Sequence, residues 1–201
     1  VGCKSGHVVV CGLGRIGEEI VRSANPKERA VVVIERDEQN VRIDGIRELG
    51  AYVIIGDATD EEILKKARAT SASYVYFVTG DDESNAEGVT DMLKLCANRK
   101  DKPSLLANMQ NQELGRTIED RGQQKKSSVS TFDVRDLAAQ QLIDELILNR
   151  LPGNEQTSHF VIVGFGPMAQ TLVLRLAELG HFANLRRSRM TVVVEPGDVV
   201  E

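Results

Sequence analysis

The 201-residue chain has no tryptophan, and aromatic residues make up only 4% of it. Because 41% of its residues are nonetheless hydrophobic, the core must be built from Val, Ile, Leu and Ala. Cysteine is also scarce. Cys3, Cys11 and Cys96 have no paired spacing, which excludes a disulfide framework and a cysteine-based zinc site. We therefore expect reduced cytosolic thiols, with Cys11 buried in a strand as a small apolar residue.

Long apolar runs are missing as well. No stretch approaches the roughly 18 apolar residues that a membrane-spanning helix needs, and no signal peptide is recognisable. The opening residues, Val1 to Ser5, look like the edge of a cut from a longer protein. The net charge of −5 argues against nucleic acid as a partner.

A glycine-rich turn follows the first hydrophobic run. The sequence from His7 to Gly17 is HVVVCGLGRIG, and a later run, VVVIE, ends at Glu35. A strand, a G-x-G-x-x-G turn, a helix and a strand that ends in an acid form the dinucleotide-binding fingerprint. Gly12 would permit the tight turn, Gly14 would let the backbone approach a pyrophosphate, and Gly17 would let helix and strand pack closely. The alternative is a structural turn with an empty site.

Glu35 ends its strand where a carboxylate can accept hydrogen bonds from an adenosine ribose. It would repel a 2′-phosphate and therefore disfavours NADP, although Arg36 lies next to it. Asp57 and Ala58 follow the predicted third strand, where an Asp could accept from an adenine amino group. Taken alone, however, a Gly-Asp pair is more often a simple turn.

Thr79 and Gly80 follow the predicted fourth strand and reach the same edge of the sheet. They are candidates for a ligand contact. An equally good interpretation is a turn that leads into a helix whose N-cap is Asp82 or Ser84.

The fingerprint recurs in a poorer form later in the chain. HFVIVGFGPMA runs from His159 to Ala169, and the run TVVVE ends at Glu195. Pro167 removes an amide donor that could face a phosphate, while the pattern tolerates Ala169 in place of the third glycine. We favour a retained scaffold over a second nucleotide site. A tandem fingerprint also favours a sensor over an oxidoreductase.

Strand-like and helix-like segments alternate along the chain. This predicts an α/β fold, a doubly wound parallel sheet of Rossmann type, followed by the start of a second Rossmann-like unit. Strands are expected at 31–35, 51–55, 74–79, 105–109 and 129–132, and helices at 16–24, 38–49, 59–68, 80–98, 112–121 and 133–151. A capping box of Thr59 and Glu62 would begin the helix at 59–68, and residues 122–128 would form a loop.

The same pattern predicts the domain organisation. Residues 1–132 would form the first nucleotide-binding domain, and 133–157 a long crossover helix with its linker. Residues 158–201 would begin a second unit, in which only two strands and one helix fit before Glu201. Such a fragment either packs on the first domain or continues in a longer protein, and we favour the second interpretation.

Four ordered segments carry a family resemblance: CGLGRIG at 11–17, VIE at 33–35, GDATD at 56–60 and VTGDDESN at 78–85. Together with Leu64 and Ala67 they resemble the RCK (regulator of potassium conductance) or Trk-type nucleotide-binding domain, over about residues 7–147. The tandem arrangement is similar to that of channels with two such domains per subunit.

The resemblance implies a cytosolic module that binds NAD or NADH, or else ADP, ATP or AMP, and controls ion flux through a potassium channel or transporter. It implies a homo-oligomer, as a dimer or an octameric ring, at the cytoplasmic face of the cell membrane. The helix at 133–151 would link lobes and pack on a neighbouring subunit. The implied contacts are Gly12, Leu13, Gly14, Arg15 and Ile16 with the phosphates, Glu35 with the ribose, Asp57 and Ala58 with the adenine, and Thr79 with the second half of a dinucleotide.

One departure from the family pattern narrows the ligand. The fifth strand of many relatives ends in Ala-Arg, whose arginine supports a phosphate, whereas this chain has Ala107-Asn108. An uncharged Asn cannot form that ion pair. We therefore expect NAD or NADH rather than a triphosphate.

Catalytic side chains are hard to find. His7 and His159 precede predicted strands, away from the crevice, and His181 follows a predicted helix, so none is placed as a general base near a nicotinamide. No Ser-His-Asp order, metal-ligand cluster or Lys-Tyr pair stands out. The sequence therefore predicts a binding module that is not an enzyme. The alternative is an NAD-dependent oxidoreductase with an unrecognised substrate site.

Overall fold

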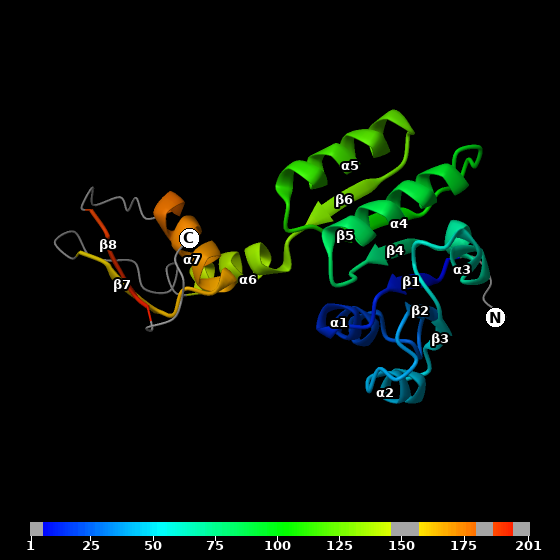
Figure 1. Ribbon diagram of the computed structural model, residues 1–201, viewed down its shortest axis with the longest axis horizontal. Coiled ribbons are helices and arrows are strands. Elements are labelled where there is room, and N and C mark those ends of the chain that lie inside the picture. The colour runs from blue at the N-terminus through cyan, green and yellow to red at the C-terminus, as the bar shows by residue number, and fades with distance from the viewer. Residues whose placement is uncertain (1–5, 146–156, 180–186, 195–201) are drawn as a thin grey trace. The chain divides into compact units, whose positions relative to one another are not determined.

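The computed structural model describes residues 6–145, 157–179 and 187–194, which belong to two units that divide between Phe132 and Asp133. The strands of the first unit are β1 (Val8–Cys11), β2 (Val31–Glu35), β3 (Tyr52–Ile55), β4 (Tyr74–Phe77), β5 (Ser104–Asn108) and β6 (Val129–Phe132). They form one parallel sheet in the order β3-β2-β1-β4-β5-β6 (Figure 1). This is the strand order of a Rossmann fold, and it confirms the predicted fold class.

Helices connect successive strands of this sheet. They are α1 (Arg15–Ala24), α2 (Ile43–Glu48), α3 (Glu61–Lys66), α4 (Asp82–Leu95) and α5 (Gln112–Gln124), with a short 3₁₀ turn, η1 (Ala69–Ser71), before β4. The chain leaves β1 in one direction, and after β3 it crosses back to β4 on the other side of β1. This reversal places the usual ligand crevice at the carboxyl ends of β1 and β4.

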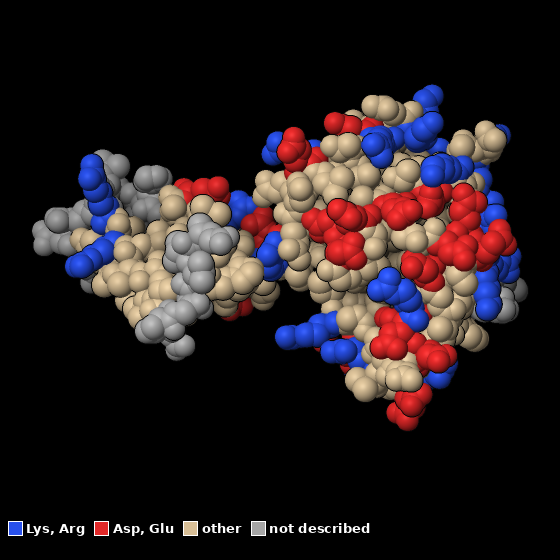
Figure 2. Space-filling view, in the orientation of Figure 1, with Lys and Arg blue, Asp and Glu red and all other residues tan. Residues whose placement is uncertain are grey.

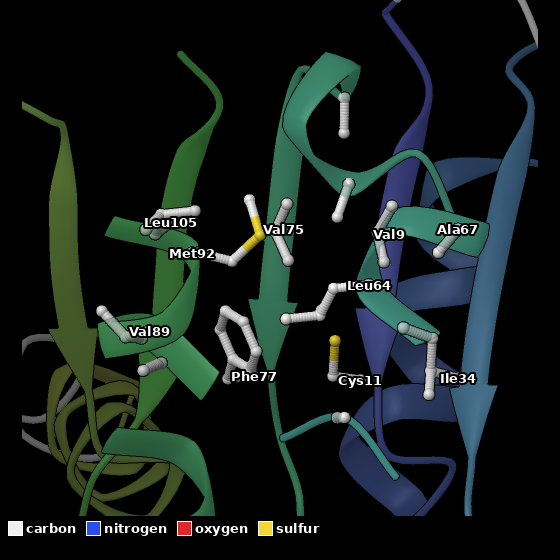
Figure 3. Close-up of a cluster of buried hydrophobic side chains, with 14 of the residues drawn as sticks. Val9, Cys11, Ile34, Leu64, Ala67, Val75, Phe77, Val89, Met92 and Leu105 are labelled. Carbon is white, nitrogen blue, oxygen red and sulfur yellow. The ribbon is translucent and has the colours of Figure 1, made fainter. Parts of the chain in front are cut away.

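Successive strand residues point to opposite sides of the sheet, and both faces are buried because helices cover them. On one face Cys11 and Phe77 pack among Leu64 of α3 and Val89 and Met92 of α4 (Figure 3). On the other face Val8, Val10, Val31 and Val33 pack with Val21 of α1 and Ile46 of α2. The expected core of aliphatic residues is confirmed.

Cys11 is fully buried, as expected, and burial raises the pKa of its thiol far above the usual range. Cys96 is also buried, with a raised thiol pKa for the same reason. Both are free thiols, which behave as small apolar residues at neutral pH. Cys3 lies outside the described residues.

The predicted helix at 38–49 is wrong in its first part, since α2 begins only at Ile43. Two side chains bond to the backbone of this segment instead: Asp37 Oδ1 accepts from the Gln39 amide at 2.9 Å, and Asn40 Oδ1 accepts from the Arg42 amide at 3.0 Å. Local bonds of this kind compete with helix formation.

The predicted caps of two helices are also wrong. Asp60, not Thr59, caps α3, because the amide and hydroxyl of Thr59 both donate to Asp57 Oδ1 at 2.9 Å. Asp81 caps α4, in place of the predicted Asp82 or Ser84, and its Oδ1 accepts from the Ser84 amide at 2.7 Å.

The loop predicted at 122–128 is partly helical, since α5 continues to Gln124. Gly122 makes this possible because it packs directly on β6: a Cβ at Gly122 would lie 2.4 Å from Val129 Cγ2. The sixth strand at 129–132 is present as expected, at the edge of the sheet.

The second unit contains α6 (Val134–Ile143), β7 (His159–Val163), α7 (Pro167–Leu179) and β8 (Arg189–Val193). β7 and β8 pair in parallel, and α6 packs against α7. Arg175 of α7 forms an ion pair with Asp136 of α6, with Nε 2.9 Å from Oδ1, and this lowers the pKa of the Asp136 carboxyl. Several predictions fall outside the described residues. They are residues 146–151 of the helix predicted at 133–151, residues 152–156 of the linker, His181 and Glu195.

Candidate functional site

The glycine turn between β1 and α1 leaves no room for a side chain at two of its three glycines. Gly12 has a φ of +100°, and a Cβ there would lie 2.8 Å from the Val78 carbonyl oxygen. A Cβ at Gly17 would lie 2.0 Å from the Gly12 carbonyl oxygen. The expected tight turn and close helix–strand packing are therefore confirmed. Gly14 differs, because no described atom lies within 4 Å of a Cβ built there and the residue is exposed.

The N-terminus of α1 carries no side-chain cap from the described residues. In contrast, Asp60, Asp81 and Asn111 cap α3, α4 and α5. The first amides of α1, like those of α2, therefore lack the side-chain oxygen that caps α3, α4 and α5. Arg15, the first residue of α1, is exposed and forms no ion pair with another described residue. An open helix N-terminus with an adjacent cation is favourable for an anion.

Glu35 lies beside this turn and fixes its shape. Its Oε2 accepts from the Leu13 amide at 2.8 Å, and its Oε1 accepts from the Asp37 amide at 2.8 Å. The Leu13 carbonyl accepts from Asn40 Nδ2 at 3.0 Å, so both backbone groups of Leu13 are occupied. The Leu13 amide therefore positions the turn and is not among the amides open to an anion. Each Glu35 oxygen keeps a further lone pair for a hydroxyl donor.

Asp57 and Arg36 meet at the ends of β3 and β2. The Arg36 Nη1 lies 3.7 Å from Asp57 Oδ2, and both side chains are well exposed. Hydrogen bonds from the amide and hydroxyl of Thr59, aided by the Arg36 charge, lower the pKa of the Asp57 carboxyl. Ala58 is buried against the core, 7% exposed. Asp57 is thus an ionised acceptor with one oxygen already used by its own turn.

Thr79 lies two residues after the end of β4, the strand on the other side of β1 from β2 and β3. Its amide donates to Asn85 Oδ1 at 2.9 Å, and its hydroxyl donates to the same oxygen at 2.8 Å. Asn85 Nδ2 donates to the Asn108 carbonyl at 2.8 Å, which ties the end of β4 to the end of β5. Gly80 is exposed, with no described atom within 4 Å of a Cβ built there.

The structure gathers the predicted residues along one edge of the sheet. A Cβ at Gly12 would lie 3.0 Å from the Thr79 backbone, Leu13 is bonded to Glu35, and Arg36 lies close to Asp57. The ends of β3, β2, β1 and β4 thus form one continuous rim. Two residues that hold this rim, Asn40 and Asn85, were not among the predicted site residues. Asn85 lies in the VTGDDESN segment and could have been suspected from it, whereas Asn40 lies in a segment that was predicted to be helical.

Carboxylates gather over α3 and α4 (Figure 2). The exposed acids there include Glu61, Glu62, Glu83 and Glu87. At the β4 end of the rim, bonds from the Ser84 amide and hydroxyl lower the pKa of the Asp81 carboxyl. The helix start beside Thr79 is therefore negatively charged at neutral pH, in contrast to the open start of α1.

The lowered pKa of Asp81 predicts acid sensitivity. A carboxyl whose pKa is lower in the folded state stabilises the fold above its unfolded pKa of about 3.9, and this stabilisation is lost as the pH falls through the folded value. We expect the urea midpoint to hold from pH 7 to about 5 and to fall below about pH 4. Asp81→Asn, which keeps an acceptor for the cap, should show a shallower fall. An equally steep fall in the variant would contradict this role of Asp81.

Two histidines lie in the part of the chain that the structure describes, His7 in the first unit and His159 in the second. His7 is buried before β1, and its Nε2 donates to the Ala67 carbonyl oxygen at 3.0 Å. His159 begins β7, with its Nε2 2.9 Å from Thr191 Oγ1. Among residues 6–145, 157–179 and 187–194, no three His, Cys, Asp or Glu side chains gather as a metal site. Nor does any helix in these ranges have the length and apolar character to cross a membrane.

Comparison with known protein families identifies the domain that contains these residues. Residues 8–126, more than half of the chain, match the TrkA-N domain. The chain belongs to the TrkA-N domain family. The resemblance to RCK and Trk-type domains is thereby confirmed, and the matched region of this TrkA-N domain includes every predicted site residue.

Two relatives of this TrkA-N domain are potassium-transport proteins by name. The chain is 30% identical to Potassium channel protein 1 of Methanocaldococcus jannaschii over 105 residues, 50% of this chain and 32% of that protein. It is 32% identical to a Trk system potassium uptake protein TrkA homolog of Pyrococcus horikoshii over 79 residues, 39% of this chain and 34% of that protein. The chain thus matches about a third of the length of these two relatives.

Solved structures share the fold at low sequence identity. GsuK bound to ADP has a TM-score of 0.68 and 15% identity, covering 98% of this chain and 46% of that chain. The GsuK channel bound to NAD has a TM-score of 0.69 and 12% identity, covering 100% and 50%. The Kef C-terminal domain of Shewanella denitrificans in its AMP-bound form has a TM-score of 0.52 and 14% identity, covering 89% and 93%. These likenesses support the Rossmann-like fold.

Proposed function

We propose that the chain is a ligand-sensing regulatory domain that binds an adenine dinucleotide, NAD or NADH in preference, and controls ion flux through a potassium channel or transporter. The observation that carries the proposal is the uncapped start of α1 beside Glu35. Membership of the TrkA-N family and relatives named for potassium transport support it.

The ligand would cross the rim from β2 to β4. Its pyrophosphate would lie on the amides of Gly14, Arg15 and Ile16, with the Arg15 guanidinium beside it. Its adenosine ribose would donate to Glu35, and its adenine would lie near Asp57 and Ala58, with Arg36 at the outer edge. NAD, ADP and AMP are bound in the structures that share this fold, and ADP, ATP and AMP remain weaker candidates for this chain.

Control of ion flux would follow from a shift between two arrangements of subunits. A ligand shifts such a balance only through its different affinity for the two states, and about 1.4 kcal/mol changes the ratio tenfold. The linked channel or transporter would read the shift at the cytoplasmic face of the membrane. We assign the chain a regulatory role without a catalytic step, because His7, the histidine described in the first unit, precedes β1 and is bonded to the Ala67 carbonyl.

We also propose that residues 158–201 begin a second RCK-like unit. Gly164 has a φ of +92°, close to the +100° of Gly12. The Gly164 amide donates to the Val193 carbonyl at 2.7 Å, just as the Gly12 amide donates to the Ile34 carbonyl at 2.8 Å. The turn geometry is therefore repeated, and residues 133–157 would form the crossover helix and linker between the units.

Self-association would use the outer face of α6. Val134, Leu137 and Leu142 on this helix are 37%, 58% and 40% exposed. Aliphatic residues on one side of a helix favour a partner helix over water. We propose that two copies of the chain pair through this face, as a dimer or within a larger ring.

Leu137→Glu is expected to weaken this pairing, because it places a charge in an apolar interface. Light scattering should show the wild type as a dimer or larger and the variant shifted towards monomer. Val41→Glu, at an apolar residue that is 90% exposed and lies outside α6, is the matched control and should leave the mass unchanged. A wild type that is monomeric at all concentrations would contradict the proposal.

Calorimetric titration tests the ligand. NAD, NADH, ADP and ATP are added in turn to the purified 201-residue chain. The proposal expects saturable binding, tightest for NAD or NADH. Binding by none of the four would remove the proposed function, and hydride transfer at enzymatic rates would replace it with that of an oxidoreductase.

A further inference from the structure

The amide of Asn85 has a fixed orientation. Its side chain is fully buried, and two of its three contacts are with the backbone. The Thr79 N–H can only donate, so the atom that faces it must be the Asn85 oxygen. The Asn108 carbonyl can only accept, so the atom that faces it must be the Asn85 nitrogen. The two backbone contacts thus settle the orientation without reference to any hydroxyl group.

This orientation fixes the polarity of the Thr79 hydroxyl. The hydroxyl oxygen lies 2.8 Å from Asn85 Oδ1 and 3.2 Å from the carbonyl oxygen of Asp81. Both neighbours are acceptors, so the single hydroxyl hydrogen of Thr79 is committed to the protein. The backbone N–H of Thr79 is committed as well. Thr79 can therefore offer an incoming ligand only lone pairs.

The chemistry of the ligand at this end follows from that polarity. An ionised phosphate has only acceptor oxygens and would face the lone pairs of Thr79 and the negative charge of Asp81. A sugar hydroxyl can donate to Thr79 without breaking an existing bond. In this strand order, a ligand whose adenosine lies over β2 extends its second half over β4, where Thr79 is located.

We propose that Asn85 sets the ligand class of the crevice, by holding Thr79 as an acceptor for a hydroxyl of a second ribose. Asn85 is a positioning residue, and Thr79 makes the contact. The inference rests on the proposed nucleotide function and deepens it. It explains a preference for a dinucleotide over a nucleotide that ends in phosphate. This argument is independent of the one from Asn108, which stands at the end of β5 where many relatives have an arginine.

The test compares three ligands by calorimetry: NAD, ADP-ribose and ADP. NAD and ADP-ribose carry a second ribose, and ADP does not. Thr79→Val removes the hydroxyl and keeps the shape of the side chain. We expect it to lower the affinity for NAD and for ADP-ribose about tenfold, as for the loss of one hydrogen bond. The affinity for ADP should stay within about twofold of the wild-type value. Thr79→Ser should restore both.

Two further variants separate positioning from stability. Asn85→Ala leaves the Asp81 carbonyl, 3.2 Å away, to hold the Thr79 hydroxyl. The hydroxyl is then less firmly oriented, so the ratio of NAD affinity to ADP affinity should fall, by less than in Thr79→Val, in protein that circular dichroism shows to be folded. Thr117→Val, on α5, removes an exposed hydroxyl that bonds a carbonyl 2.9 Å away, and should change nothing. If Asn85 had only a structural role, Asn85→Ala would lower the affinity for all three ligands alike and leave the ratio of NAD affinity to ADP affinity unchanged.

The outcomes distinguish the two claims. If the wild type binds none of the three ligands, the proposed function fails. If the wild type binds, but Thr79→Val weakens ADP as much as NAD or leaves NAD unchanged, the nucleotide function stands and the assignment of Asn85 and Thr79 is overturned.

Discussion

Gly17→Ala is expected to lower the free energy of unfolding by about 3 kcal/mol, a large effect for the addition of one methyl group. The reason is that the new Cβ would lie 2.0 Å from the Gly12 carbonyl oxygen. That oxygen belongs to a backbone turn that is fixed by the bond from the Gly12 amide to Ile34. Neither side can move without separating α1 from β1. Urea or thermal unfolding measures the loss.

Gly45→Ala is the matched control for this substitution. Gly45 lies in α2, is exposed and has no described atom within 4 Å of an added Cβ. Alanine there should stabilise the helix by up to about 1 kcal/mol. If both variants unfold at the wild-type midpoint, the close packing of α1 on β1 is not what requires glycine at position 17.

Gly14→Asp should abolish nucleotide binding and leave the fold intact. Gly14 is the N-cap of α1, with φ −80° and ψ −166°, and other residues adopt this extended conformation without strain. The introduced carboxylate would cap the open amides and occupy the proposed phosphate position with a like charge. We expect the affinity for NAD to fall at least about 100-fold, or about 2.8 kcal/mol.

The same substitution should raise the stability of the ligand-free chain by about 0.3 kcal/mol, because Asp is a slightly better N-cap than Gly. Gly45→Asp, which introduces the same charge on an open helical surface, should leave binding unchanged. The opposite signs of the two effects make Gly14→Asp informative. Retention of NAD affinity in this variant would show that the phosphate does not lie at the start of α1.

The parts of the molecule that follow from local sequence were predictable. Runs such as Val31 to Glu35 have the β-branched, doubly apolar character of covered parallel strands, and the spacing of Gly12 and Gly17 reflects a turn that has no space for side chains. The parallel, doubly wound sheet could therefore be anticipated in outline.

The parts that depend on distant partners could not be predicted. Asn40 supports the glycine turn through the Leu13 carbonyl, 27 residues earlier in the chain. Asn85 links Thr79 to Asn108, and its contact with Asn108 spans 23 residues of the sequence.

One local feature was also predicted wrongly. The N-cap of α3 is Asp60 and not Thr59, because Thr59 bonds to Asp57, and hydrophobic periodicity does not reveal such competition between neighbouring residues.

A crystal structure of the chain grown with ADP tests the central claim most directly. The account predicts the pyrophosphate within hydrogen-bond distance of the amides of Arg15 and Ile16, and the ribose hydroxyls on the Glu35 carboxylate. ADP bound elsewhere, or a rim closed by the side chains of the protein itself, would contradict it.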